Sequence, residues 1–168
     1  MKHLFLTGEQ GAGKTALLTR LLPRDAPPCG FVTERTQTPE GLGVYLHAPG
    51  SGRRYTEANR VGSWENGAMR PHPEVFDTLG VQLLSQPVPG RPILMDELGV
   101  LEQSAPLFCG RVLELLDGRH PVLGVVKNKS CPFLDAVRSH PNVEVVWVSE
   151  HNRDALYSSL NLRQNAVL

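Results

Sequence analysis

The stretch Gly8-Glu9-Gln10-Gly11-Ala12-Gly13-Lys14-Thr15 decides the fold of this chain. Its spacing, a glycine, four other residues and then Gly-Lys-Thr, is typical of a phosphate-binding loop, or P-loop. Residues 3–6 before it predict a buried strand, and residues 14–22 after it predict a helix that ends at Pro23. Because the motif requires a strand before it and a helix after it, we expect the loop to hold the phosphates of a nucleoside triphosphate.

Each residue type in this loop has a physical use in phosphate binding. Gly8, Gly11 and Gly13 allow backbone dihedrals and a close approach that a Cβ atom would prevent. Backbone N–H groups along the loop and the helix N-terminus would then meet the phosphate charge. We expect Lys14 to reach the β- and γ-phosphates as a catalytic cation, and the Thr15 hydroxyl to ligate Mg²⁺. A flexible strand-to-helix turn without a ligand is the alternative.

A second acidic element follows the apolar run Ile93-Leu94-Met95, where the chain continues with Asp96-Glu97. The carboxyl ends of parallel strands line the ligand crevice of a sheet. We therefore expect Asp96 to hold Mg²⁺ and Glu97 to orient or deprotonate an attacking water. The alternative is a helix N-cap followed by an acid in the first turn. A protein that only binds nucleotide has no need of the second carboxylate.

The rest of the chain alternates apolar runs with helical patterns, which favours an α/β fold. We predict a P-loop nucleoside-triphosphatase architecture, a mostly parallel sheet with helices on both faces, in a single domain over 1–168. Further strands are predicted at 29–35, 92–95, 121–126 and 143–148, and further helices at 74–85, 105–116, 132–139 and 153–161.

One part of the chain predicts an insertion into this sheet. Residues 43–48 and 53–58 flank the turn sequence Pro49-Gly50-Ser51-Gly52, which predicts an antiparallel hairpin. Residues 59–73 have no clear period and carry Gly, Pro and Asn, so we predict a long surface loop there.

Composition excludes several classes of protein. Seventeen basic and seventeen acidic side chains give a formal net charge of zero, which argues against a broad nucleic-acid surface. The apolar runs are far shorter than the ~18 residues of a membrane span, and the P-loop follows Met1 too closely for a signal peptide. Cys29, Cys109 and Cys131 form no Cys-x-x-Cys pair and predict buried free thiols. We expect a cytoplasmic protein.

The chain resembles a family of small P-loop nucleoside-triphosphatases that includes the cancer-related nucleoside-triphosphatase. The resemblance implies a monomeric enzyme that slowly hydrolyses ATP, GTP and other nucleoside triphosphates with Mg²⁺ and little base preference. It covers nearly the whole chain and rests on five segments: Leu6-Thr7-Gly8 to Thr15, Gly30-Phe31-Val32-Thr33-Glu34, Val61-Gly62-Ser63-Trp64, Asp96-Glu97-Leu98-Gly99 with Glu102 and Phe108, and Asn152-Arg153.

The resemblance adds two nucleotide-binding candidates, Asn152 and Arg153. A cap at the start of the last helix is the alternative role for Asn152. Phosphoryl transfer often uses a further cation near the γ-phosphate. Arg35, Arg70 and Arg153 are the candidates, with Arg153 favoured, and a surface salt bridge is the alternative role of each.

The chain departs from the family at two places. Val100-Leu101 stands where the family has Lys-Met, so we expect a slower enzyme or one that uses another cation. Residues 65–73 are also unlike the family, so the resemblance does not predict the structure of the entrance to the site.

Two other functions remain as alternatives at this point. In a nucleotide or small-molecule kinase, Asp96 or Glu97 would activate an acceptor hydroxyl, and phosphate release without an acceptor separates this from hydrolysis. A nucleotide-dependent switch would bind tightly with negligible turnover. Asn128-Lys129-Ser130-Cys131 approaches the guanine-selecting sequence of switch GTPases but lacks its Asp.

Overall fold

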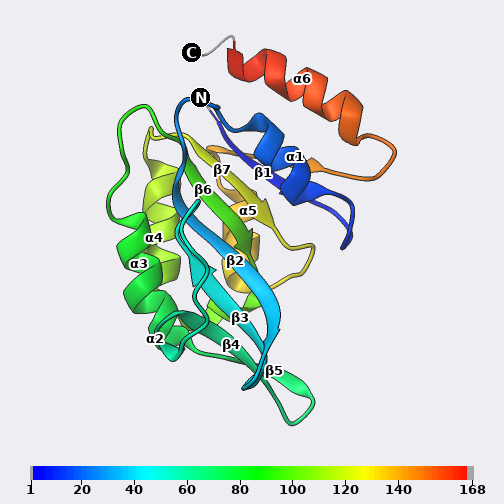
Figure 1. The fold of residues 1–168 in the computed structure, drawn as a ribbon. Coiled ribbons are helices and arrows are strands. Elements are labelled where there is room, and N and C mark those ends of the chain that lie inside the picture. Colours follow the sequence, from blue (N-terminus) through cyan, green and yellow to red (C-terminus); the bar gives the residue numbers. More distant parts are fainter. Residues whose placement is uncertain (1, 166–168) are drawn as a thin grey trace.

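A computed structural model of the chain describes residues 2–165; of the predicted domain over 1–168, residue 1 and residues 166–168 lie outside this range. Eight strands form one sheet in the order β5-β4-β3-β2-β6-β7-β1-β8 (Figure 1). Strands β2, β6, β7, β1 and β8 run parallel, whereas β3, β4 and β5 are antiparallel additions at one edge. The bounds are β1 His3–Thr7, β2 Cys29–Thr38, β3 Gly41–His47, β4 Arg60–Glu65, β5 Ala68–Pro71, β6 Ile93–Leu98, β7 Val122–Val126 and β8 Val143–Trp147.

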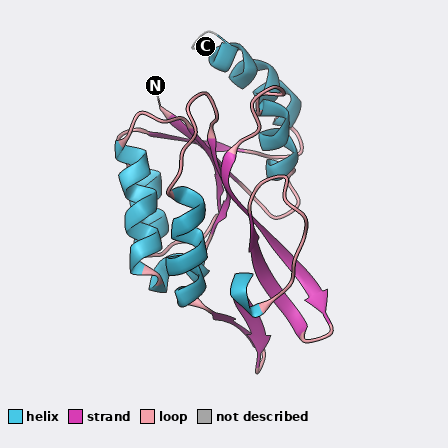
Figure 2. Ribbon diagram, turned by 60° about the vertical axis from the view of Figure 1, so that its left-hand side comes forward, coloured by secondary structure: helices cyan, strands magenta, loops and turns pink. Residues whose placement is uncertain are grey.

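Helices cover both faces of the parallel part of the sheet (Figure 2). One face carries α1 (Lys14–Leu21) and α6 (Arg153–Asn165). The other carries α4 (Pro106–Asp117), α5 (Pro132–Ser139) and a continuous helical segment made of α2 (Pro73–Val75), a π-helical stretch (Phe76–Gly80) and α3 (Val81–Leu84). Among the described residues, no helix has the length and apolar character to cross a membrane.

The alternation of side chains along β1 shows why the sheet needs both layers. Leu4 and Leu6 pack with α1 and α6, while Phe5, between them, packs in the core under α4 and α5. All five residues of β1 and all five of β7 are buried. Strands that are buried along their whole length are typical of a parallel sheet that is covered on both faces. The predicted fold class is therefore confirmed.

The predicted hairpin between 43–48 and 53–58 is wrong in its second strand. Strand β3 pairs instead with β2 across a turn at Pro39-Glu40, and on its other side with β4. Residues 53–58 form a loop that ends in a 3₁₀ turn, Glu57–Asn59. The buried Asn59 side chain holds that loop, since its Nδ2 donates to the carbonyls of Leu46 at 3.0 Å and Arg54 at 2.8 Å.

The predicted surface loop over 59–73 is also wrong, because strands β4 and β5 form a hairpin there. Its turn carries Asn66 at φ 51° and Gly67 at φ 80°. Two successive positive φ angles at Asn-Gly are the mark of a tight hairpin turn that matches the twist of the strands. The Asn66-Gly67 pair is thus the signal in the sequence that indicates this hairpin, although the flanking residues show no clear hydrophobic periodicity.

Candidate active site

The P-loop joins β1 to α1 and uses its glycines where a side chain would not fit. Gly8 has a φ of 147°, and a Cβ atom there would lie 2.3 Å from the carbonyl oxygen of Val148. Gly13 has a φ of 88° and caps the N-terminus of α1 in the left-handed conformation. Both backbone positions favour glycine. The loop of residues 8–13 therefore connects the end of β1 at Thr7 to the start of α1 at Lys14, with the helix N-terminus directed toward the loop.

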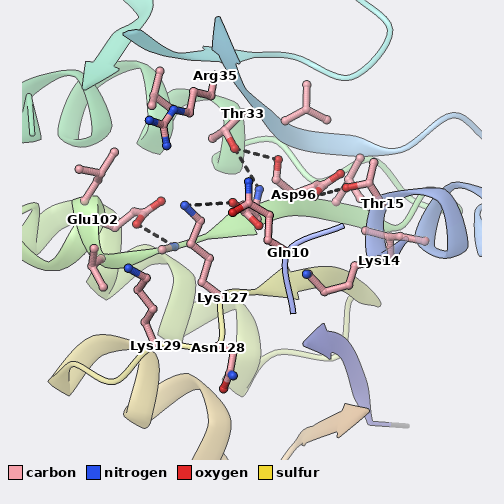
Figure 3. A pocket seen from close by; sticks show the side chains of 18 of the residues that line it. Gln10, Lys14, Thr15, Thr33, Arg35, Asp96, Glu102, Lys127, Asn128 and Lys129 are labelled. Atoms are coloured by element: carbon pink, nitrogen blue, oxygen red, sulfur yellow. Dashed lines mark hydrogen bonds and ion pairs between the residues drawn. The ribbon is translucent and has the colours of Figure 1, made fainter. Parts of the chain in front are cut away.

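Lys14 and Thr15 begin α1 and face the end of β6 (Figure 3). The Lys14 Nζ donates to the carbonyl oxygens of Gly8 at 3.0 Å and Glu9 at 2.7 Å. The Thr15 hydroxyl donates to Asp96 Oδ1 at 3.2 Å. The P-loop and the acidic element, which are remote in the sequence, therefore meet in one site.

Asp96 and Glu97 lie near the carboxyl end of β6, and Thr33 of β2 fixes the peptide between them. The Thr33 hydroxyl donates to the Asp96 carbonyl at 3.3 Å and accepts from the Glu97 amide at 3.2 Å. Burial raises the pKa of Asp96 to about 6, and the charge of Glu97 adds to the rise, whereas the Thr15 hydrogen bond and Lys14 oppose it. A buried carboxylate of this kind is stabilised by a cation.

Thr33 was not predicted as a site residue. Its only signal in the sequence was the resemblance of the Gly30 to Glu34 segment. The hydrogen bonds across β2 and β6 give that segment a physical role.

Lys127 is a second site residue that the sequence analysis missed. It follows the last residue of β7, and its Nζ lies 3.2 Å from Glu97 Oε1. Its backbone amide donates to the Leu98 carbonyl at 2.9 Å, which ties the end of β7 to the end of β6. The signal available was its position at the carboxyl end of a buried parallel strand.

Glu102 is buried under this site and shapes the turn after β6. Its Oε2 accepts a hydrogen bond from the Gly99 amide at 2.9 Å and so caps the 3₁₀ turn Val100–Ser104. Burial raises the pKa of Glu102 to about 8, while hydrogen bonding to the backbone and the charge of Lys127 act in the opposite direction. This shift favours the protonated form of the carboxyl group.

A cavity of about 900 Å³ contains these groups. It extends from the P-loop and α1 past the ends of β6 and β7 to a wall formed by β2, β3 and β4. Val100, where the resemblance led us to expect a lysine, lines the cavity without contributing charge. The polar and charged side chains around it include Glu9, Gln10, Lys14, Thr15, Thr33, Arg35, Arg53, Asp96, Glu97, Glu102, Lys127, Asn128 and Lys129.

The remaining predicted residues are distributed around the site. The Arg153 guanidinium packs on Gly13 so closely that a Cβ atom on Gly13 would lie 2.5 Å from Arg153 Nη1. The Asn152 side chain is used inside its own loop, where Oδ1 accepts from the Ser149 amide at 2.8 Å and Nδ2 donates to the Trp147 carbonyl at 3.0 Å. Asn152 thus fastens the turn before α6.

The other two arginine candidates lie further from the P-loop. Arg35 borders the cavity, with its guanidinium carbon 6.0 Å from the ring centre of Trp64. Arg70 pairs with Glu65 at 3.2 Å on the exposed hairpin, with two thirds of its side chain accessible. Their positions favour Arg35 over Arg70 as a group that reaches a ligand.

The three cysteines are free, and each is only partly buried. Burial raises the pKa of the Cys109 thiol to about 12, with Glu102 adding to the effect. The prediction of free thiols is confirmed, although the thiols are less buried than expected.

A glycine-rich loop closed by α1 and faced by Asp96 defines a P-loop protein of the α/β class. Residues 3–161 match the protein family described as NTPase, and the chain belongs to this family of enzymes.

Similar sequences and similar structures cover the chain almost completely. The nucleoside-triphosphatase THEP1 of Natranaerobius thermophilus is 28% identical over an alignment that covers 96% of this chain and 95% of that protein. THEP1 of Thermofilum pendens is 29% identical and covers 92% and 91%. The crystal structure of THEP1 from Aquifex aeolicus superposes with a TM-score of 0.73 at 21% identity, covering 95% and 96%.

The solution structure of a human cancer-related nucleoside triphosphatase has a TM-score of 0.67 at 24% identity and covers 99% of this chain and 98% of that one. These two structural similarities concern the fold.

Proposed function

We propose that this chain hydrolyses nucleoside 5′-triphosphates to diphosphate and phosphate, with Mg²⁺, at the site formed by the P-loop and the end of β6. The observation that carries the proposal is the hydrogen bond between Thr15 and Asp96, which brings the two halves of the site together with Glu97 adjacent. The curated relatives are named nucleoside-triphosphatases, which supports the same reaction here.

The P-loop binds the triphosphate in this proposal. Backbone amides of residues 8–15 and the N-terminus of α1 surround the β-phosphate. Lys14, which donates to two loop carbonyls, exchanges them for β- and γ-phosphate oxygens. Arg153, packed on Gly13, flanks the same loop and contacts the nucleotide from its outer side.

Thr15 and Asp96 fit the binding of Mg²⁺. Both supply oxygen atoms, which this ion prefers, and the two oxygens lie 3.2 Å apart at the start of α1. The Asp96 carboxylate is largely buried, so a divalent cation would compensate for its desolvation. When bound with the nucleotide, Mg²⁺ would neutralise charge on the β- and γ-phosphate oxygens.

Glu97 positions the water. Its carboxylate accepts a hydrogen bond from a water molecule in line with the bond between the γ-phosphorus and the bridging oxygen. The water oxygen bonds to phosphorus as the bond to the bridging oxygen breaks, and the diphosphate leaves. One water proton passes to Glu97 and is released with the phosphate. Catalysis then depends on positioning and on charge stabilisation by Lys14.

A phosphate-release assay without any acceptor tests this function. The full chain is incubated with ATP, GTP, CTP or UTP, with Mg²⁺ or with EDTA, and Lys14→Ala serves as the control. We expect Mg²⁺-dependent release from all four nucleotides and a loss of at least ~100-fold in Lys14→Ala. Equal rates for the wild type and Lys14→Ala would overturn the proposal, and release that requires an added acceptor would favour a kinase.

A further inference from the structure

The position of Lys127 suggests a role in the reaction. Strand β7 lies between β6 and β1 in the sheet, so the residue that follows β7 stands between the acidic element and the P-loop. Lys127 occupies this place and borders the same cavity as Lys14 and Glu97. Its Nζ lies 3.2 Å from Glu97 Oε1. A cation is therefore held next to the group that the proposed function assigns to the water.

The backbone around Lys127 is firmly held. Its amide donates to the Leu98 carbonyl at 2.9 Å, and its carbonyl accepts from the Lys129 amide at 2.8 Å. The Arg138 guanidinium donates to the carbonyls of both Lys127 and Lys129, and it also donates to Asp135 at 3.2 Å. The backbone of the loop is thus held by hydrogen bonds from α5. These bonds involve the backbone of Lys127 and leave its side chain unconstrained.

The side chain follows a defined path into the cavity. Its stem passes over Gly99, where a Cβ atom would lie 3.2 Å from Lys127 Cδ. The absence of a side chain at Gly99 therefore leaves room for the stem. The ammonium group at its end can swing between neighbouring partners, because a lysine head is a compact charge on a flexible chain.

We propose that Lys127 binds the γ-phosphate and exchanges its Glu97 partner for it when the nucleotide enters. In the pair with Glu97, the lysine side chain is 45% exposed and the glutamate side chain is 30% exposed. Ion pairs that are this accessible to solvent add little stability, so the pair is easily broken. A γ-phosphate carries a higher charge than a carboxylate and attracts the ammonium group more strongly. The exchange leaves the Glu97 carboxylate free for the water.

Other cations near the cavity lack this combination of features. Arg153 packs on Gly13, Arg35 lies over Trp64, and Arg53 pairs with Glu34 at 3.7 Å rather than with Glu97. Lys129 lies in the same loop and borders the cavity, but it makes no ion pair with an acidic side chain of the described residues. Lys129 is therefore a matched control for charge in this loop.

Nucleotide binding without turnover tests the inference, which rests on the proposed function for the site. The affinity of the full chain with Mg²⁺ is measured for ADP and for the β,γ-methylene analogue of ATP, which carries a γ-phosphate that is not hydrolysed. The chains compared are the wild type, Lys127→Met, Lys127→Arg and Lys129→Met, each also in a Glu97→Gln background. Thermal unfolding of each variant is recorded alongside.

We expect Lys127→Met to weaken the binding of the triphosphate analogue by about 10- to 100-fold, which corresponds to the loss of one charged hydrogen bond. The binding of ADP should weaken by less than about 3-fold. Lys127→Arg should retain most of the affinity for the triphosphate analogue. Lys129→Met should lose less of this affinity than Lys127→Met. The γ-phosphate-specific loss should persist with Glu97→Gln, because the contact is to the ligand.

Three results would overturn the inference. These are equal losses for ADP and the analogue, equal losses in Lys127→Met and Lys129→Met, or a loss that disappears in the Glu97→Gln background. The last result would mean that Lys127 only holds Glu97. If Lys127→Met unfolds, equal losses of affinity for ADP and the analogue in a folded Lys127→Arg count against the proposal as well. Failure of the wild type to release phosphate would refute the proposed hydrolysis while leaving the binding comparison readable.

Discussion

Thr15 at the start of α1 and Asp96 near the end of β6 share a hydrogen bond of 3.2 Å across 81 positions of sequence. It is the point at which the phosphate loop and the acidic strand become one site. A hydroxyl and a largely buried carboxylate in contact are the two oxygen ligands that the proposed Mg²⁺ site uses. The predictions below follow from this relationship and from the groups around it.

Asp96→Asn should raise the concentration of Mg²⁺ needed for half-maximal phosphate release by at least ~10-fold, because a neutral amide oxygen binds Mg²⁺ less well than a carboxylate. A Mg²⁺ titration at saturating ATP measures this. Asp117→Asn removes an exposed carboxylate that pairs with His140 on the far side of the sheet and should leave the titration unchanged. An unaltered Mg²⁺ requirement in Asp96→Asn would remove Asp96 from the metal site.

Glu97→Gln should lower the rate of phosphate release by about 10²- to 10⁴-fold, because the amide cannot accept a proton from the water. Binding of the nucleotide should change by less than about 3-fold, because the role proposed for Glu97 is toward the water and not toward the bound phosphates. Single-turnover rates and equilibrium binding separate the two effects. Glu144→Gln, on β8 and paired with Arg163, serves as the control. A rate equal to that of the wild type would contradict the assigned role.

Gly8→Ala should destabilise the fold and abolish nucleotide binding. The φ of 147° alone costs an alanine about 1–3 kcal/mol, and the added Cβ would meet the Val148 carbonyl. Gly110→Ala is the matched control, because Gly110 lies in α4 with no atom within 4 Å of an added Cβ. That change should stabilise the chain by up to about 1 kcal/mol. Thermal unfolding of the two variants measures the contrast, and equal midpoints would contradict it.

Glu102→Gln should remove a pH dependence of stability. The pKa of Glu102 is raised from its ordinary value of 4.5 to about 8 in the folded chain, so the folded state retains a proton that the unfolded state releases. This contribution is complete below about pH 4.5 and is lost as the pH rises through about 8. The buried group faces Lys127 and Glu97, and its amide replacement can still accept from Gly99.

Urea unfolding at pH 5, 7 and 9 measures this effect. From pH 5 to pH 9, the free energy of unfolding of the wild type should fall relative to that of Glu102→Gln by more than about 1.4 kcal/mol, the equivalent of one pKa unit. Glu114→Gln, an exposed residue paired with Arg111, should behave as the wild type. Parallel pH profiles for the wild type and Glu102→Gln would show that Glu102 does not titrate as described.

The parts of the site that follow from local chemistry could be predicted from the sequence. The P-loop is read from eight adjacent residues, and Asp96 and Glu97 from a single apolar strand. Strand and helix positions were also close, as in α5, whose observed bounds agree with the predicted 132–139. Each of these features depends on neighbouring residues and on general rules for parallel sheets.

What could not be predicted depends on contacts between distant segments. Strand β3 was expected to pair with 53–58 because a Gly- and Pro-rich turn separates them, yet its hydrogen bonds go to β2 and β4. Lys127 and Thr33 join the site only through the order of β2, β6 and β7, which no local pattern specifies. The monomeric state and the cytoplasmic location stay predictions.

Phosphate release in ¹⁸O-labelled water tests the central claim most directly. The chain is incubated with ATP and Mg²⁺ without an acceptor, and the products are analysed by mass spectrometry. Hydrolysis at this site predicts one ¹⁸O atom in the released phosphate, none in ADP, and loss of the labelled phosphate in Lys14→Ala. Unlabelled phosphate, or labelled phosphate formed equally fast by Lys14→Ala, would contradict the account.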